Sequence, residues 1–292
     1  MFSNSKFASI NSNIITPDCL LQDANGFSGL KQIFESASKL SNLGVGYKEW
    51  NTSQIASFEK VFYYTGLKEL DVTEWNFSNA TNYKYMFASA LNKIEGLSKM
   101  ITKDSKNINI DYMFQNVNFD TTKKNYWGEL KSWDWSKVTS LTYAFAGSNL
   151  TTTESFWATA DDDVNIALSN SITSIDSLFS DCKYLSFIRM PKLTNLTSIA
   201  SAFKNVAANI TVAGSYANIY LTDVSLSKIS ESGYADFLSG AHINNLQFNT
   251  NKEIKRDIDF STAIFVSPGY FLLVESDGGA GSVTPLVECI NS

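Results

Sequence analysis

A phenylalanine recurs along the chain with apolar residues at the same positions ahead of it. Before Phe62, the apolar residues lie one, four and seven positions earlier, at Val61, Phe58 and Ile55. Spacings of three and four place side chains on one face of a helical turn. The same template precedes seven further phenylalanines, although it is weakest at the last. The eight anchors are Phe34, Phe62, Phe87, Phe114, Phe145, Phe179, Phe203 and Phe237.

Short stretches in which apolar and polar residues alternate follow several anchors, after a bend rich in Gly, Ser, Ala or Asn. This alternation predicts short strands. Asn, Ser and Thr cluster ahead of the expected helical turns, where a side-chain oxygen can cap the free amides. One unit therefore reads as a helical turn, a bend and a strand. The expected strands cover residues 67–72, 185–190, 209–212 and 245–248.

A tryptophan lies twelve residues ahead of three anchors, at Trp50, Trp75 and Trp133. An echo of about 25 to 30 residues is typical of stacked supersecondary units. The sequence therefore predicts an α/β repeat solenoid of about eight short helix-turn-strand units. We assign the three tryptophans to packing, because they lie in one phase of the repeat. The alternative is an ordinary α+β domain in which the phenylalanine spacing is coincidental.

The chain divides into three expected parts. Residues 1–26 are polar and form an N-terminal cap or an anchor, and residues 27–250 form the solenoid. Residues 251–292 break the repeat and form a small β-rich C-terminal cap. Its expected strands are residues 263–266, 270–274 and 283–287.

Two units share the pattern Trp-[Asn/Asp]-x-Ser-x-[Val/Ile] with a closing Phe, at residues 50–62 and 133–145. This pattern resembles the tandem repeats of mycoplasma and BspA-like bacterial surface proteins, a divergent leucine-rich-repeat-like family. The resemblance implies a leucine-rich-repeat-like fold, surface exposure and a role in adhesion or recognition. It implies no catalytic residues. Thr102, Ala167 and Pro191 stand where other units have tryptophan.

Two long intervals between anchors locate insertions, one before and one after Phe145. In repeat proteins such insertions form loops, often on the binding face. Aromatic side chains in polar loops can anchor a partner or carry a sugar. Packing over the base of the loop is the alternative. The candidate binding residues are Tyr126, Trp127, Phe156 and Trp157.

The second insertion also contains Asp161, Asp162 and Asp163. Carboxylate oxygens suit calcium, so these residues are a weak candidate metal site. They lack the spaced ligands, the glycine and the final glutamate of an EF-hand, which favours a solvated acidic loop. Cys19, Cys182 and Cys289 are odd in number and far apart, so they predict neither a disulfide framework nor a zinc site.

Charge and hydropathy exclude some classes of partner. The net charge is −6 and the 23 basic residues form no dense cluster, so we expect no nucleic-acid partner. The chain shows no secretory leader pattern and no run of about 18 apolar residues. We therefore expect no signal peptide, transmembrane segment or membrane insertion. A surface location then requires either that an export signal was removed or that the protein leaves the cell within a virus particle.

Catalytic patterns are missing from the sequence. His242 is the single histidine, and no Gly-x-Ser-x-Gly or cysteine-protease signature accompanies it. We expect a non-catalytic protein without a cofactor, which recognises a protein or glycan on a cell surface. The alternative is a structural virion protein, such as a phage head or tail decoration, bound to other virion proteins. Homo-oligomers are compatible with both hypotheses, and a hydrolase using paired carboxylates is a third.

Overall fold

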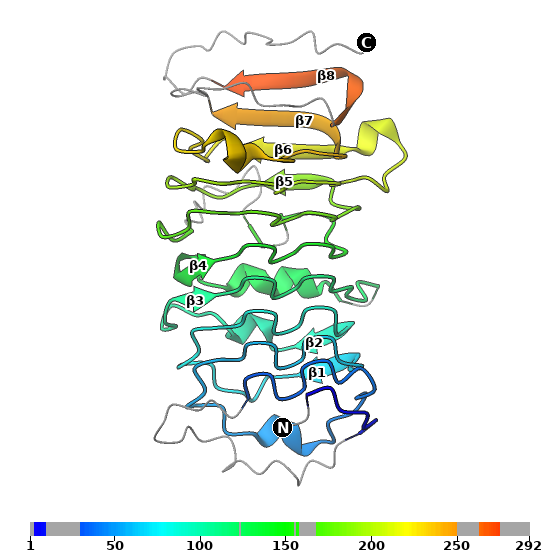
Figure 1. Cartoon of the computed structure of the whole chain (residues 1–292), viewed down its shortest axis with the longest axis vertical. Helices are drawn as coiled ribbons and strands as arrows, with labels where there is room; N and C mark the ends of the chain where they lie inside the picture. The colour runs from blue at the N-terminus through cyan, green and yellow to red at the C-terminus, as the bar shows by residue number, and fades with distance from the viewer. Residues whose placement is uncertain are drawn as a thin grey trace. The chain divides into compact units, whose positions relative to one another are not determined.

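The computed structural model describes residues 3–9, 30–122, 124–154, 156–157, 168–249 and 263–274 of this 292-residue chain (Figure 1). The chain consists of two compact units, Met1–Asn149 and Leu150–Ser292. The expected boundaries after residues 26 and 250 fall outside the described ranges and stay predictions.

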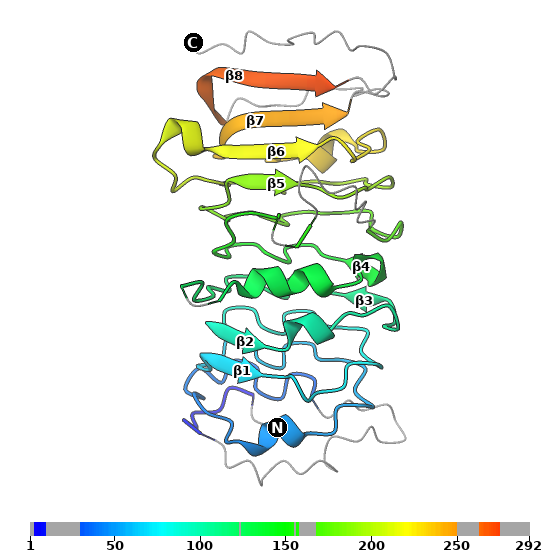
Figure 2. The same cartoon turned by 180° about the vertical axis from the view of Figure 1, so that it is seen from behind.

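The first unit contains short 3-10 helices and two pairs of parallel strands. Strand β1 (Glu69–Asp71) pairs with β2 (Lys93–Glu95), and β3 (Ile108–Asn109) pairs with β4 (Val138–Ser140). Each pair lies side by side in both views (Figures 1 and 2). The 3-10 helices are η3 (Gly46–Glu49), η4 (Leu97–Lys99), η5 (Tyr126–Ser132) and η6 (Trp135–Lys137).

The second unit is built on a four-stranded sheet in which all neighbours run parallel, in the order β5-β6-β7-β8. The strands follow one another in the chain, as the colours of Figure 1 show. Their bounds are β5 (Phe187–Arg189), β6 (Ala217–Leu221), β7 (His242–Asn249) and β8 (Ile264–Val274). Two 3-10 helices, η7 (Ala213–Ser215) and η8 (Glu231–Tyr234), lie between them in sequence.

The expected helix-turn-strand solenoid is wrong. The residues that the structure describes contain no α-helix, and their strands form three small parallel sheets. Where the sequence predicts a helical turn, the amide of Phe62 donates to the carbonyl of Met86 at 3.1 Å. An α-helix would use that amide for the carbonyl of Phe58. The distant partner therefore replaces the helix, and the residues ahead of the anchors form turns.

The expected strands are partly correct. β1 and β5 lie inside the predicted stretches 67–72 and 185–190, and β7 includes residues 245–248. Residues 209–212 are not a strand, and β6 begins five residues later, at Ala217. The two strands predicted at 263–266 and 270–274 are one strand, β8, whereas residues 283–287 lie outside the described ranges.

Each anchor is the centre of a five-residue stretch that we call an anchor segment. The first, third and fifth amides of a segment donate to carbonyls in or just before the next segment. In segment 60–64, the amides of Lys60 and Tyr64 donate to Lys84 and Ala88 at 2.9 and 3.0 Å. The segments joined in this way are 32–36, 60–64, 85–89, 112–116 and 143–147 in the first unit, and 177–181, 201–205 and 236–240 in the second.

The first and fifth residues of every anchor segment have a left-handed backbone, with φ between 53° and 68°. This conformation costs an L-residue about 1–2 kcal/mol. Three hydrogen bonds to the next segment return about 0.5–1.5 kcal/mol each. Burial of an anchor ring adds about 1.5–3 kcal/mol, so the arrangement is favourable as a whole.

The eighth anchor is Leu238, not Phe237. The amide of Phe203 donates to the carbonyl of Phe237, the place that Met86 holds for Phe62. Positive φ at Asp236 and Gly240 also centres this segment on residue 238. Both side chains are buried, so the hydrophobic pattern alone does not distinguish them.

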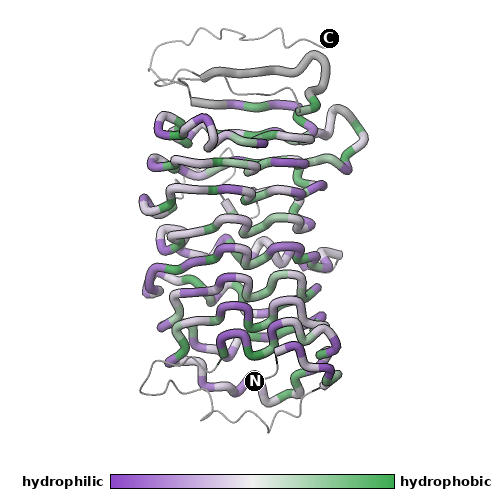
Figure 3. Tube along the Cα trace, viewed as in Figure 1, coloured by the Kyte–Doolittle hydropathy of each residue, from purple (hydrophilic) through white to green (hydrophobic). Residues whose placement is uncertain are grey.

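The anchor rings form the core of the first unit. Ring centroids of Phe62 and Phe87 are 6.3 Å apart and nearly parallel, and those of Phe114 and Phe145 are 5.6 Å apart. Hydrophobic residues recur at matching places along the traced segments (Figure 3). The tryptophans Trp50, Trp75 and Trp133 are each 4% exposed. The predicted apolar template is therefore a core template, although no helix carries it.

We predict that Phe87→Ala destabilises the protein strongly. The ring is fully buried and lies 5.9 Å from that of Phe114, so truncation leaves a cavity and should cost about 3–5 kcal/mol. Urea unfolding followed by tryptophan fluorescence measures the loss. Tyr64→Ala, at a side chain that is 54% exposed, should change stability by less than about 0.5 kcal/mol. Equal effects of the two variants would contradict this core.

Candidate functional site

The aromatic residues predicted from the insertions lie in the interior. Tyr126 and Trp127 belong to η5 and are 3% and 2% exposed, and Phe156 and Trp157 are 0% and 2% exposed. This burial favours packing over surface contact for all four. Asp161–Asp163 lie outside the described residues, so the weak metal candidate stays a prediction.

A row of tyrosines lies instead on the partly exposed side of the first unit. Tyr85, Tyr112 and Tyr143 occupy the first position of three consecutive anchor segments. Ring centroids of Tyr85 and Tyr112 are 4.2 Å apart at 15°, and those of Tyr112 and Tyr143 are 4.6 Å apart at 8°. We call these three residues the tyrosine ladder. Tyr112 has a ring against each of its faces, so its exposed part is its edge.

The backbone of the tyrosine ladder is strained. All three residues have φ of 57–59°, a conformation in which a bulky side chain is an outlier. At about 1–2 kcal/mol each, the strain totals about 3–6 kcal/mol. Two stacked pairs return about 0.5–1.5 kcal/mol each, so stacking offsets only part of it. The same conformation occurs at the first position of every anchor segment, where the hydrogen bonds between segments and the buried anchor ring offset its cost, so the strain is a feature of the fold. In the second unit, Ser177 and Ser201 hold the same position.

Two lysines lie beside the ladder. Lys84 Nζ is 5.8 Å from the ring centroid of Tyr85 and 5.7 Å from that of Tyr112, within cation–π distance. Lys60 contacts Tyr85 similarly, and its ammonium also pairs with Glu35 at 2.9 Å. Among the described residues, Lys84 forms no ion pair. Lys84 therefore offers an uncompensated positive charge at the tyrosine ladder.

Asp111 connects the anchor segment of Tyr112 to that of Tyr143. Its side chain is buried, and its Oδ1 accepts hydrogen bonds from the amide of Thr142 at 2.9 Å and from the hydroxyl of Ser140. The carboxylate thereby joins the backbone just before Tyr112 to the backbone just before Tyr143. This link holds neighbouring rings in register.

The environment of the ladder changes the acidity of its phenols. Burial, followed by the negative charge that Tyr85 would carry and the hydrogen bond with Tyr85, raises the pKa of Tyr112 to about 12. Burial also raises the pKa of Tyr85. Both phenols therefore stay protonated near neutral pH. The hydrogen bond between them raises the pKa of Tyr112 and acts to lower that of Tyr85, so Tyr112 is the donor and the hydroxyl proton of Tyr85 is the one available to a ligand.

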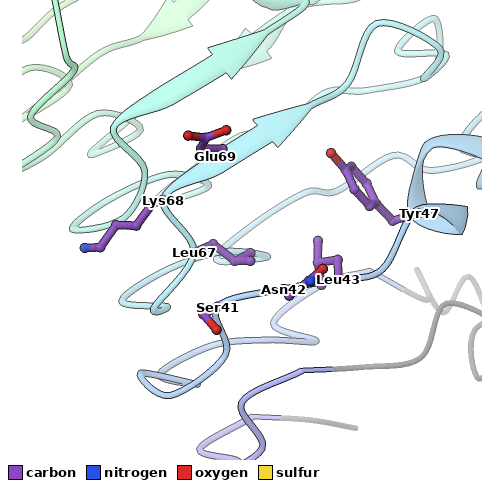
Figure 4. A pocket seen from close by; sticks show the side chains of 7 residues that line it. All are labelled: Ser41, Asn42, Leu43, Tyr47, Leu67, Lys68 and Glu69. Atoms are coloured by element: carbon purple, nitrogen blue, oxygen red, sulfur yellow. The ribbon is translucent and has the colours of Figure 1, made fainter.

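A hollow of about 360 Å³ opens near the start of β1. Its walls come from residues 41–43, from Tyr47 of η3 and from residues 67–69 (Figure 4). Glu69 pairs with Lys93, and the hydroxyl of Tyr47 accepts the amide of Asp71 at 2.9 Å. These polar groups already have protein partners, so we place the candidate site at the tyrosine ladder.

Asp71 ends β1, the strand whose first residue, Glu69, lines the hollow. Hydrogen bonds from Lys48 and then from Thr73 lower the pKa of the Asp71 carboxyl to about 2. The carboxylate is therefore charged at all physiological pH values and holds η3 against β1. Its role is structural, because both oxygens have partners within the unit.

Other predicted features are buried or bonded to the backbone. His242 of β7 lies with Nδ1 3.3 Å from the carbonyl of Ile210 and packs against Tyr216. Cys182 is fully buried. No group of His, Cys, Asp and Glu within the described ranges could hold a metal ion. No helix among those residues is long and apolar enough to cross a membrane.

One family match was found. Residues 28–157 match the family described as "Mycoplasma protein of unknown function, DUF285". This match confirms the predicted resemblance to mycoplasma-type surface repeats for that part of the chain, which includes the whole tyrosine ladder. It does not extend to leucine-rich repeats. No curated protein and no solved structure matches the chain.

The sequence contains a signal for the tyrosine ladder that lies outside the insertions. A tyrosine stands two residues ahead of three consecutive anchors, at Tyr85, Tyr112 and Tyr143. The spacing of two residues is outside the apolar template, so a recurring aromatic there has no packing role in a helical turn. The recurrence of tyrosine at one repeat position is therefore the sequence evidence for the ladder.

We predict that Tyr112 ionises at an unusually high pH. Its pKa is raised in the folded state, so the protonated form is favoured there. The resulting stabilisation is present below pH 10.0 and is lost as the pH rises towards about 12. Subtracting the tyrosinate absorbance of Tyr112→Phe from that of the parent protein isolates this group.

The difference curve of the native proteins should have its midpoint well above 10, and the same subtraction in denaturant should give the ordinary value of about 10. A native midpoint at the ordinary value would show that Tyr112 is not enclosed by its neighbours.

Proposed function

We propose that the protein is a non-catalytic, surface-exposed scaffold that recognises a protein or glycan through the tyrosine ladder. The observation that carries this proposal is the row of three stacked, partly exposed rings of Tyr85, Tyr112 and Tyr143, beside which the ammonium group of Lys84 lies. The match of residues 28–157 to a mycoplasma surface-repeat family supports a location outside the cell.

The ladder offers chemistry that suits recognition. Tyrosine combines a large apolar ring with a hydrogen-bonding hydroxyl and loses little conformational entropy on binding. Here the rings are fixed by stacking and by the backbone. Binding of a partner therefore loses little side-chain entropy. Lys84 adds a positive charge for an acidic or strongly polar group on that partner.

The structural virion hypothesis would place the contacts at the chain termini. The ladder lies within the first unit, away from residues 1–26 and 251–292 in sequence, and a structural decoration gives no reason for a row of partly exposed tyrosines there. A hydrolase would require facing carboxylates, and the ladder consists of phenols and lysines. Recognition therefore accounts best for this group of residues.

Binding should depend on the hydroxyl groups and on Lys84. We predict that the double variant Lys84→Ala, Tyr85→Phe loses at least about tenfold in affinity, because each well-placed polar contact contributes about 1 kcal/mol or more. The parent protein is first screened against a glycan array and a panel of purified extracellular-matrix proteins. Affinities for the ligands found are then measured by calorimetry.

Tyr184→Phe serves as the matched control, because it removes a hydroxyl from an exposed tyrosine outside the ladder. It should bind like the parent. Thermal unfolding of the double variant should match the parent, since both ring stacks remain. Absence of any ligand in the screen, or equal binding by the double variant, would refute the proposed function.

A further inference from the structure

The outward face of the parallel sheet in the second unit has its own binding chemistry. Side chains of β5 and β6 alternate, with Ile188 and Ile219 fully buried and their neighbours partly exposed. The register pairs Arg189 with Tyr220, and Tyr220 with Gln247. This parallel register places an arginine, an aromatic ring and an amide side by side on the outward face.

Arg189 is held against the aromatic rings. Its guanidinium carbon lies 5.0 Å from the ring centroid of Tyr220, and the ring of Phe187 lies 5.2 Å from that of Tyr220. The guanidinium is therefore packed on an apolar surface and partly shielded from water. Arginine stacks on aromatic rings in this way while its remaining donors stay directed at a ligand.

Among the described residues, no acidic side chain compensates the charge of Arg189. Its Nε is buried and has no hydrogen-bond partner, and Arg189 forms no ion pair within the described parts of the chain. A buried donor that lacks an acceptor costs free energy, and more so when it is charged. An anionic group bound at the terminal nitrogens of Arg189 would neutralise that charge.

Amide groups extend the same face. The side chain of Asn244 donates to Oδ1 of Asn218 at 3.0 Å. The buried Oδ1 of Asn245, in the next position of β7, has no hydrogen-bond partner. In the sheet register Asn245 pairs with Asn218, and Asn218 pairs with Phe187 on its other side. The oxygen of Asn245 is enclosed, whereas the amide of Gln247, which pairs with Tyr220 in the register, is partly exposed, and a hydroxyl group could donate to it.

We propose that this face, formed by Phe187, Arg189, Tyr220 and Gln247, binds an acidic saccharide. Arg189 takes the carboxylate or sulfate, the aromatic rings pack against the apolar face of a sugar ring, and the side-chain oxygen of Gln247 accepts from a sugar hydroxyl. An acidic peptide would use the arginine but would supply fewer hydroxyl donors for the amide. The site belongs to the second unit and does not depend on binding at the tyrosine ladder.

The arginine side chain itself reports on binding. The chain contains two arginines, Arg189 and Arg256, so a ¹H–¹⁵N spectrum of the full-length protein shows two Nε–Hε signals. The spectrum of Arg189→Gln lacks the signal of Arg189, which assigns both signals. Titration with 3′-sialyllactose and with a heparin tetrasaccharide should shift the Arg189 signal and leave that of Arg256 in place. Lactose, which is neutral, should bind at least tenfold more weakly than the acidic saccharides.

Variants separate a specific site from general attraction of anions. Arg189→Gln should reduce affinity for the acidic saccharide at least tenfold, whereas Lys183→Ala, which removes the same charge from an exposed side chain, should not. Arg189→Lys keeps the charge and should recover only part of the affinity, because the planar fork is lost. Circular dichroism verifies that all variants are folded.

Three results would overturn the proposal. The Arg189 signal could stay unchanged with both acidic saccharides, or the lysine control could weaken binding as much as Arg189→Gln does. Finally, a polyglutamate peptide could bind at this face as tightly as the saccharides, which would assign the site to acidic peptides instead.

Discussion

The fold depends on hydrogen bonds from every second amide of one anchor segment to carbonyls of the next. An amide such as that of Phe87 donates forward to Met113, so it is not available to a helix. This bonding requires left-handed residues at both ends of each segment. Burial of the ring at the centre contributes free energy that offsets the strain of these residues. The core, the strand pairs and the candidate site all follow from this repeated contact.

The same contact creates the candidate functional site. Neighbouring segments lie at the spacing of hydrogen-bonded chains, about 4.8 Å. Side chains at equal positions of successive segments must then stack, which is why ring centroids of Tyr112 and its two neighbours lie 4.2 and 4.6 Å away. A rigid row of phenols results without any loop to order it. In the second unit, the parallel register similarly brings Arg189 and Tyr220 together.

The sequence predicted which residues are buried better than it predicted their backbone. Ile55, Phe58, Val61 and Phe62 are all fully buried, as the apolar template requires. Spacings of three and four are typical of a helix, but successive tight turns can bury the same positions. The hydrogen bonds that decide between them join residues far apart in sequence, and no local pattern records them. Leu238 was missed because its neighbour is a phenylalanine.

The candidate site was predictable only in part. Aromatic residues in insertions, such as Trp127, suggested contact surfaces, yet an insertion can also fold back over the core. The tyrosine row was visible as a recurrence at one repeat position, although its stacking required the register. The sheet face around Arg189 had no sequence signal, because its residues come from three strands and share no motif.

The bonding between segments can be observed directly by NMR, through scalar couplings across hydrogen bonds in deuterated protein. The structure predicts a correlation between the amide nitrogen of Phe62 and the carbonyl carbon of Met86, and another between Phe87 and Met113. A correlation from Phe62 to the carbonyl carbon of Phe58 would instead show an α-helix at this position and would contradict the account given for the fold and for the tyrosine ladder.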